Sequence, residues 1–324
     1  MEIVKKDTSL SIPKKRKRNR DNSKTIFSIY KSEKTLKDYM FHLNDFLKYI
    51  YEYEGGLDPE KTMNMMNNIE KEDIEDYLKH LLLDRELKKS SINKIISSLK
   101  SLYKELEKNG YNNPFKYIPL FKTTKHNLDN VLKLSYEELK EIISKFCVVD
   151  DKTFRDLVIL YTLFYTGLRS SELINLKYND IIERQGSIVL RLKETKSGKE
   201  QYKPLHDECY KKIMELKNYI VKLYKIDLEE ILDHYIFSKS FLPNEKMSYN
   251  NLYRIIKEKG LTIGKDISPH NIRHTVATEL SLHGADILEI RDFLGHADTK
   301  VTEVYINAKN ILEKRAITKL PKLV

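Results

Sequence analysis

Apolar residues recur at helical spacing in three stretches of the first third of the chain. They are Leu36, Tyr39, Met40, Leu43, Leu47 and Ile50 in the first stretch, Ile74, Tyr77, Leu78, Leu81 and Leu82 in the second, and Ile92, Ile95, Leu99, Leu102 and Leu106 in the third. Spacings of three and four residues place side chains on one face of a helix. The third helix is predicted to start at Ser90 or Ser91 as its N-cap and to end at Asn109-Gly110. We predict a small helical domain over residues 26–112.

The helical pattern breaks after this domain. Prolines and several polar residues interrupt it, so residues 113–130 are predicted to form a linker. A second domain is predicted over residues 131–324. Ser135 and Glu138 have the spacing of a capping box, which predicts the start of a helix. A longer apolar run, from Leu157 to Thr166, predicts a buried helix that leads into Gly167.

A β-hairpin is predicted inside the second domain. Ile188, Leu190 and Leu192 occupy every second position, as in a strand with one buried face. A second extended run, residues 201–205, follows and leaves Lys196 at the tip of the hairpin. From Asp207 onward the chain is predicted to be mostly helical. The predicted fold class is mainly α, with two domains and a small antiparallel β-sheet in the second.

The charge of the chain favours a polyanionic partner. Lysine and arginine total 58 against 48 aspartate and glutamate, a formal charge of +10. Basic proteins gain affinity for nucleic acids by releasing counterions from the phosphates. A mildly basic surface without such a partner is the alternative. Residues 1–25, which include the run Lys14 to Arg18, are predicted to be a mobile basic tail. This tail would grip DNA phosphates, act as a nuclear address, or be a solvated terminus.

Several other classes of protein are disfavoured by the sequence. Cys147 and Cys209 lie far apart and have no CxxC partner, so neither a zinc site nor a disulfide framework is expected. The start of the chain has no apolar run that resembles a signal peptide. The longest apolar stretch, Leu157 to Leu168, is too short to span a bilayer. We therefore expect a soluble, intracellular protein in the cytoplasm that is not associated with a membrane.

Six residues of the second domain form a set suited to attack on a DNA phosphate. They are Arg169, Lys196, His270, Arg273, His296 and Tyr305. The planar guanidinium groups of Arg169 and Arg273 suit the non-bridging oxygens of a phosphodiester, because they donate paired hydrogen bonds. His270 and Arg273 are three residues apart on a helix that is predicted to begin near Pro269, so both point the same way. Such donors act most strongly on charge that develops in the transition state. We therefore expect neither a metal nor a cofactor.

The remaining roles follow from what phosphoryl transfer needs. Tyr305 is the candidate nucleophile. A phenol has a pKa of about 10, so it needs cationic neighbours or a base, which His270 would provide. Lys196 would protonate the departing 5′ oxygen. His296, just after a glycine turn, would donate to the phosphate or support Tyr305.

Each of these residues also has an ordinary structural explanation. Arg169 would pair with Glu172, and Lys196 would be a solubilising turn residue. A single histidine is most often a polar surface or helix-end residue, and a single tyrosine among 21 is most often a packing or surface residue. The occurrence of all six in this order favours strand cleavage over coincidence.

With these residues the chain resembles the tyrosine recombinase family of the phage-integrase type, and in particular the Xer-type site-specific recombinases. The matching stretches are Thr166 to Leu173, the hairpin of Lys196 ending in Lys203-Pro204-Leu205, Ser268 to His274, His283 to Asp286, Leu294-Gly295-His296, and Tyr305. The resemblance covers the whole second domain and is highly specific there. The first domain fits more loosely, as the SAM-like helical core-binding domain that precedes the catalytic domain in this family.

The resemblance implies the DNA breaking-rejoining enzyme fold and a C-shaped clamp around double-stranded DNA with a specific core site. Tyr305 would leave a 3′-phosphotyrosine and a free 5′-hydroxyl, and strand exchange would pass through a Holliday junction without ATP or metal. Arg169, Lys196, His270, Arg273 and His296 would surround Tyr305. A homotetramer, or a heterotetramer with a second recombinase, would hold two duplexes. The helix predicted from Asn307 to Ile317 would pass to a neighbouring protomer.

The chain departs from the family pattern in two places. Ile306-Asn307 follows Tyr305 where Xer enzymes more often have Thr-His, a change expected to be harmless. The tail before the first helical domain is too short to be the arm-binding domain of larger phage integrases, which favours a simple recombinase acting on a short core site.

Two other functions stay open beside site-specific recombination. A type IB topoisomerase uses a similar site for relaxation without a partner duplex, and a recombinase-derived accessory protein would bind DNA without cutting it. Resolution of chromosome or plasmid dimers and integration or excision of a mobile element are equally compatible with the sequence.

Overall fold

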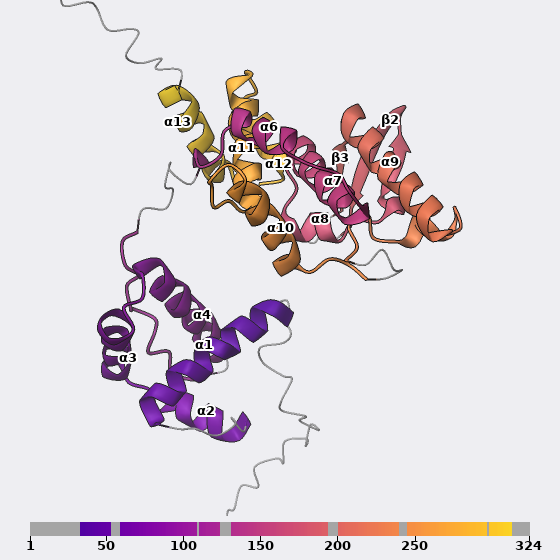
Figure 1. The fold of residues 1–324 in the computed structure, drawn as a ribbon. Helices are drawn as coiled ribbons and strands as arrows, with labels where there is room; N and C mark the ends of the chain where they lie inside the picture. Colours follow the sequence, from indigo (N-terminus) through magenta and orange to yellow (C-terminus); the bar gives the residue numbers. More distant parts are fainter. Residues whose placement is uncertain are drawn as a thin grey trace, which may run out of the picture. The chain divides into compact units, whose positions relative to one another are not determined.

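The computed structural model describes residues 33–52, 59–108, 110–123, 131–193, 200–239, 245–296 and 298–312. The basic tail, the hairpin tip with Lys196 and the end of the chain after Leu312 lie outside the described residues. The chain divides into two compact units, Met1–Thr124 and Lys125–Val324 (Figure 1). The predicted class, mainly α with one small antiparallel sheet, is confirmed.

The first unit is helical throughout its described elements. They are α1 (Glu33–Tyr51), α2 (Pro59–Asn67), α3 (Lys71–Lys79) with a π-helical extension η2 (His80–Asp84), and α4 (Lys89–Glu107). The three predicted apolar stretches lie on α1, on α3 with η2, and on α4, so those predictions are confirmed. Their apolar faces form one core, in which Leu43, Leu99 and Tyr103 are completely buried. The periodicity did not predict α2.

The predicted start of α4 was wrong by two to three residues. Lys88 is the N-cap, in an extended conformation, and no side chain caps this helix end. The backbone N–H of Ser91 donates to the Lys88 carbonyl at 2.8 Å, which closes the first turn before the serines can act as caps. At the other end Lys108 is the C-cap, and Gly110 has a φ of +84°.

The second unit combines helices with a three-stranded sheet. In chain order its elements are α6 (Tyr136–Ser144), α7 (Asp151–Thr166), α8 (Ser170–Ile174), η3 (Tyr178–Asp180), β1 (Ile181–Arg184), β2 (Ser187–Leu192), β3 (Gln201–Pro204), α9 (Asp207–Tyr224), η4 (Glu230–Asp233), α10 (Tyr249–Leu261), α11 (Pro269–Leu282), α12 (Ile287–Leu294), η5 (Thr299–Val301) and α13 (Glu303–Leu312). The capping box before α6 is confirmed, because Ser135 and the third helical residue, Glu138, cap each other reciprocally.

The sheet has the order β1-β2-β3, and both pairs are antiparallel. The predicted pairing of β2 with β3 is therefore confirmed, with Leu190 opposite Lys203. The strand β1 was not predicted, since its four residues include two adjacent polar ones, Glu183 and Arg184, and it shows no alternation. Positions 194–199, which connect β2 to β3, lie outside the described part of the chain.

Helix α7 is the centre of the second unit. It packs against α9 and against α11, and α11 in turn packs against α12 and α13 (Figure 1). The main core surrounds α7, and a second apolar cluster joins α11, α12 and α13 through Val276, Ile290, Leu294 and Tyr305. Helix α13 begins at Glu303, before Tyr305, so the predicted start of the last helix at Asn307 was wrong. Tyr305 thus lies in the first turn of a helix that is packed onto α11.

Among the described residues, no helix is both long and apolar enough to cross a membrane.

Candidate active site

Two helices of the second unit end at glycines that lie next to candidate residues. Helix α7 ends at Thr166 with Gly167 as C-cap, at φ +58°, and α12 ends at Leu294 with Gly295 as C-cap, at φ +65°. Glycine adopts this left-handed conformation without steric strain, which is why it so often follows a helix. Arg169 follows the first glycine by two residues and His296 directly follows the second. The ends of α7 and α12 therefore carry two of the candidate side chains, Arg169 and His296, on glycine turns.

The two arginines bind the carbonyl oxygens at these helix ends. Arg273 donates from Nη1 to the Gly167 carbonyl at 2.5 Å and from Nη2 to the Leu294 carbonyl at 2.6 Å. Arg169 donates from Nη2 to the Gly295 carbonyl at 2.8 Å. The last carbonyls of a helix lack intrahelical partners and carry the negative end of the helix dipole, so cations are stabilised there. Each guanidinium is thereby fixed by backbone, and it keeps further N–H donors for a ligand.

Glu172 is the carboxylate of this cluster. It accepts hydrogen bonds from Nη1 of Arg169 at 2.8 Å and from the Arg169 backbone N–H at 2.7 Å, and its side chain is buried. The structural explanation of Arg169 as the partner of Glu172 is thus correct, and it does not exclude a role on phosphate. Arg273 is only 2% exposed. Burial and the nearby charge of Arg169 lower the pKa of Arg273 to about 10, so it remains charged at neutral pH.

Tyr305 is 1% exposed, and its hydroxyl is held by a histidine that was not a candidate. The Nδ1 atom of His274 lies 2.8 Å from the Tyr305 hydroxyl. The ring of His296 stacks near Tyr305, with centroids 6.4 Å apart and planes at 16°. Burial raises the pKa of Tyr305 to about 12, while the charge of Arg273 acts to lower it. In this structure the phenol is therefore protonated and covered.

His270 contacts His274, which in turn contacts Tyr305. It is exposed at the start of α11, and its ring meets that of His274 edge to face with centroids 4.2 Å apart. Partial burial, with the charges of Arg273 and Arg169, lowers the pKa of His270. The same causes lower the pKa of His296 to about 4, and its Nδ1 lies 3.0 Å from Oγ1 of Thr302. Both rings are neutral at pH 7, the state in which an imidazole can accept a proton.

The structure thus gathers five of the six candidates, Arg169, His270, Arg273, His296 and Tyr305, at one place in the second unit. Lys196 lies outside the described residues. Within the part of the chain that is described, no group of three or more His, Cys, Asp or Glu side chains could hold a metal ion.

Sequence reasoning did not assign three further members of the cluster. His274 follows His270 by four residues, so their helical spacing already placed both on one face of α11. Glu172 was considered only as a structural partner of Arg169. Lys203 lies in β3, where nothing in the local sequence indicates that a lysine is buried.

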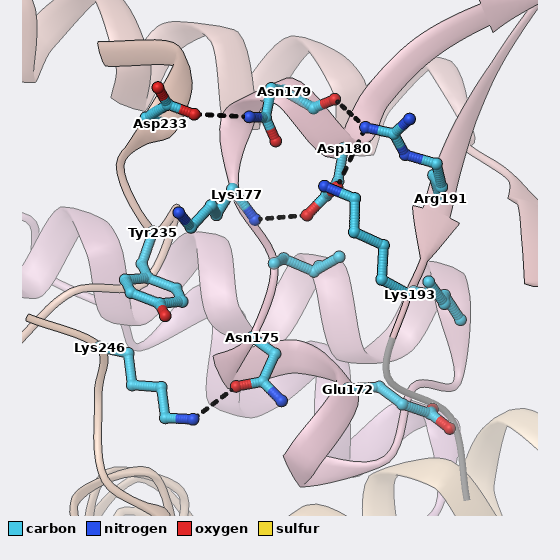
Figure 2. A pocket seen from close by; sticks show the side chains of 12 residues that line it. Glu172, Asn175, Lys177, Asn179, Asp180, Arg191, Lys193, Asp233, Tyr235 and Lys246 are labelled. Atoms are coloured by element: carbon cyan, nitrogen blue, oxygen red, sulfur yellow. Dashed lines mark hydrogen bonds and ion pairs between the residues drawn. The ribbon is translucent and has the colours of Figure 1, made fainter. Parts of the chain in front are cut away.

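A separate cavity of about 430 Å³ lies beside this cluster and shares only Glu172 with it. None of the five candidate residues that the structure describes lines the cavity. Figure 2 shows that charged side chains in it are held by neighbours, with Lys193 on Asp180 at 2.7 Å and Lys246 on the side-chain oxygen of Asn175 at 2.7 Å. The candidate active site is therefore the cluster at the two helix ends.

Gly167→Ala should destabilise the second unit and reduce activity, because an added Cβ would lie 2.7 Å from Cδ2 of Leu294. The left-handed conformation costs an alanine about 1 kcal/mol, and the overlap adds roughly 1 to 3 kcal/mol. Gly264→Ala is the matched control, since Gly264 has a φ of +73° and open space around the position of a Cβ. Chemical denaturation should show the larger loss for Gly167→Ala. Equal losses would mean that contact between the helix ends does not matter.

Comparisons with known proteins show the family to which the chain belongs. Residues 133–310 match the Phage integrase family, and residues 22–113 match the Phage integrase, N-terminal SAM-like domain. A tyrosine recombinase of Thermosipho africanus (strain TCF52B) is 30% identical over 300 residues, which cover 89% of this chain and 94% of that protein. Tyrosine recombinase XerC of Staphylococcus aureus is 30% identical over 294 residues, which cover 86% of this chain and 87% of that protein.

Solved structures show the same fold. One is the XerH site-specific recombinase bound to palindromic difH substrate in a post-cleavage complex, with a TM-score of 0.64 and 21% identity, covering 88% of this chain and 79% of that one. Another is a lambda integrase dimer bound to a COC′ core site, with a TM-score of 0.55 and 18% identity, covering 92% of this chain and 94% of that one. The chain therefore belongs to the phage integrase family and is an Xer-like tyrosine site-specific recombinase.

Proposed function

We propose that this recombinase cuts and rejoins DNA at a specific core site through a 3′-phosphotyrosine on Tyr305. One observation carries the proposal: Arg273 contacts both helix ends that precede Arg169 and His296, and its charge acts on Tyr305. A phosphate bound beside the two arginines would meet the nucleophile and neutral imidazoles together. The catalytic roles of all six residues are part of this proposal.

The chemistry balances without an external energy source. The Tyr305 oxygen attacks phosphorus and forms a phosphodiester with the 3′ end, while the bond from phosphorus to the 5′ oxygen breaks. A neutral imidazole, that of His270, takes the phenol proton, and Lys196 gives a proton to the leaving 5′ oxygen. Arg169 and Arg273 stabilise the charge on the non-bridging oxygens, where losing one such donor typically lowers a rate by about 10² to 10³. Attack by a second 5′-hydroxyl reverses the sequence and joins new strands.

Cleavage also requires that Tyr305 leave its buried position. Its hydroxyl is bound to His274, and the surrounding apolar cluster includes Val276 and Leu294. The first turn of α13 therefore has to shift when DNA is bound. We propose that the pairing of protomers on two duplexes, in a homotetramer or with a second recombinase, produces this shift and carries exchange through a Holliday junction.

The proposed biological role is either the resolution of chromosome or plasmid dimers or the integration or excision of a mobile element, at the nucleoid in the cytoplasm. Resolution of chromosome or plasmid dimers and movement of an element are both served by the same chemistry. XerH, the structural relative described above, is bound to its difH substrate in a post-cleavage complex. A short duplex core site is the corresponding substrate proposed for this chain.

The wild-type protein should form detergent-resistant adducts with DNA in the presence of a chelator. Sheared genomic DNA from the source would be incubated with protein, denatured, and sequenced from the covalently bound fraction. Enrichment at one sequence supports the proposal and identifies the site. Adducts scattered over all sequences would instead support relaxation by a topoisomerase. Absence of adducts, with a second recombinase also supplied, would support a binding protein and contradict the proposal.

A further inference from the structure

Lys203 has an unusual environment for a lysine in a strand. Its side chain is 5% exposed, and its Nζ donates to the Thr166 carbonyl at 3.0 Å and also to the Phe293 carbonyl. Thr166 is the last residue of α7, and Phe293 lies in the last turn of α12. One amino group thus joins the same two helix ends that Arg273 joins.

The three cations divide the free carbonyls of these ends between them. Lys203 binds the carbonyls of Thr166 and Phe293. Arg273 binds the carbonyls of the next residue at each helix end, Gly167 and Leu294. Arg169 binds the carbonyl of Gly295. Glu172 is the carboxylate that pairs with Arg169. The cluster therefore carries more positive than negative charge in a buried place, which favours entry of an anion.

An ordinary structural role does not explain this lysine well. Residues alternate between faces in a strand, and in β3 the position of Lys203 faces inward while Tyr202 and Pro204 are exposed. An apolar residue would fill such a position without the penalty of burying an amine. The ring of Phe293, 4.6 Å from Nζ, adds a contact that attracts a cation.

We propose that Lys203 is a positioning residue for strand cleavage: it holds the turn that carries Arg169 against the turn that carries His296. The inference rests on the proposed function, because it concerns the geometry of the same phosphate site. Lys203 touches backbone and not substrate in this arrangement. Its loss should therefore change how well the site is assembled, and not how tightly DNA is held.

The protonation of Lys203 offers a readout that a simple packing role would not affect. Burial, followed by the charge of Arg273, lowers the pKa of Lys203 to about 7, while Glu172 acts to raise it and Arg169 to lower it. His296 is a further titratable group that interacts with Lys203. A neutral amine has two N–H donors, enough for both carbonyls, and the ammonium adds a third donor and a charge. A bound phosphate would favour the ammonium.

The pKa shift also has a definite consequence for stability. The unfolded chain binds the lysine proton below a pKa of 10.5, and the folded chain binds it only below about 7. Between these values the unfolded state carries more protons, so stability should rise with pH across this window. Lys203→Met should lack this rise, which thermal melts measure without any DNA.

The experiment compares wild type, Lys203→Met and Lys203→Arg, with Lys265→Met as control. Lys265 also donates to a backbone carbonyl of the second unit, that of Lys133 at 2.9 Å, and pairs with Glu138 at 2.6 Å, and neither of these partners is a candidate residue. Single-turnover adduct formation at saturating DNA should fall by about 10²-fold in Lys203→Met, the usual effect of a misplaced site, with DNA affinity nearly unchanged. Lys203→Arg should recover part of the rate. Lys265→Met should form adduct at the wild-type rate.

Two further measurements separate this role from its alternatives. Because a neutral Lys203 still donates to both carbonyls, the loss of rate in Lys203→Met relative to wild type should persist on both sides of pH 7. A 5′-bridging sulfur, a better leaving group, should rescue Lys196→Ala and not Lys203→Met. A Lys203→Met rate within twofold of wild type, or melts with the wild-type pH dependence, would overturn the inference. Wild-type protein that forms no adduct would contradict the proposed function instead, while the melts would still report on Lys203.

Discussion

Tyr305→Phe should bind its DNA site with wild-type affinity and form no covalent adduct. The substitution removes the only atom of this side chain that can attack phosphorus. The hydroxyl also accepts or donates one hydrogen bond with His274, at 2.8 Å, so the variant should lose only about 1 kcal/mol of stability. Gel electrophoresis after denaturation measures the adduct, and a mobility shift without denaturation measures binding.

Tyr178→Phe is the matched control for this experiment. Tyr178 is buried in the same unit, and its hydroxyl has no hydrogen-bond partner among the described residues. Its removal should leave both stability and adduct formation at the wild-type level. An adduct of undiminished yield in Tyr305→Phe would show that another residue is the nucleophile. Loss of the adduct in both variants would point to a general effect of removing tyrosine hydroxyls.

The buried position of Tyr305 adds a kinetic expectation. Because burial raises the pKa of Tyr305 to about 12, the resting phenol is a poor nucleophile at neutral pH. If Tyr305 moved out of its buried position toward the arginines, burial would no longer raise its pKa, and the charge of Arg273 would still lower it. Adduct formation should therefore depend on the assembly of protomers on DNA more steeply than DNA binding does.

The parts of the fold that sequence predicted are those set by local pattern. The apolar stretches of α1, α3 and α4, the capping box of Ser135 and the proline at the start of α11 were confirmed, because each signal lies within a few residues of the element it starts or covers. Helix α2 and strand β1 were missed because both are short and neither shows a clear period.

Five of the six candidate residues lie together in the structure, whereas the contacts between them were not predicted from the sequence. Glycine followed by Arg169 or His296 is a local signal, and the left-handed turns at Gly167 and Gly295 agree with it. The hydrogen bond between His274 and Tyr305 depends on α13 packing against α11, which no local pattern indicates. The burial of Lys203 could not be predicted from the local sequence either, because it arises where β3 meets the ends of α7 and α12.

Arg273→Ala should lower both stability and cleavage, and the loss of cleavage should exceed what instability explains. The buried guanidinium satisfies the carbonyls of Gly167 and Leu294. Leaving buried acceptors without donors costs about 1 to 3 kcal/mol each. Cleavage should fall by a further factor of about 10² to 10³, from the loss of a donor to the phosphate. The pKa of Tyr305 should also rise, because Arg273 is the charge that lowers it.

Arg155→Ala separates these two effects. Arg155 is 4% exposed in the same unit, and its Nη1 donates to the carbonyls of Ser238 and Lys239 at 2.9 and 3.0 Å. This variant should lose comparable stability and keep its rate per folded molecule. Arg273→Lys tests geometry, because an ammonium keeps the charge and lacks the planar fork that spans both helix ends. If it cleaved at the wild-type rate, charge alone would suffice and the fixed geometry of the two helix ends would not govern catalysis.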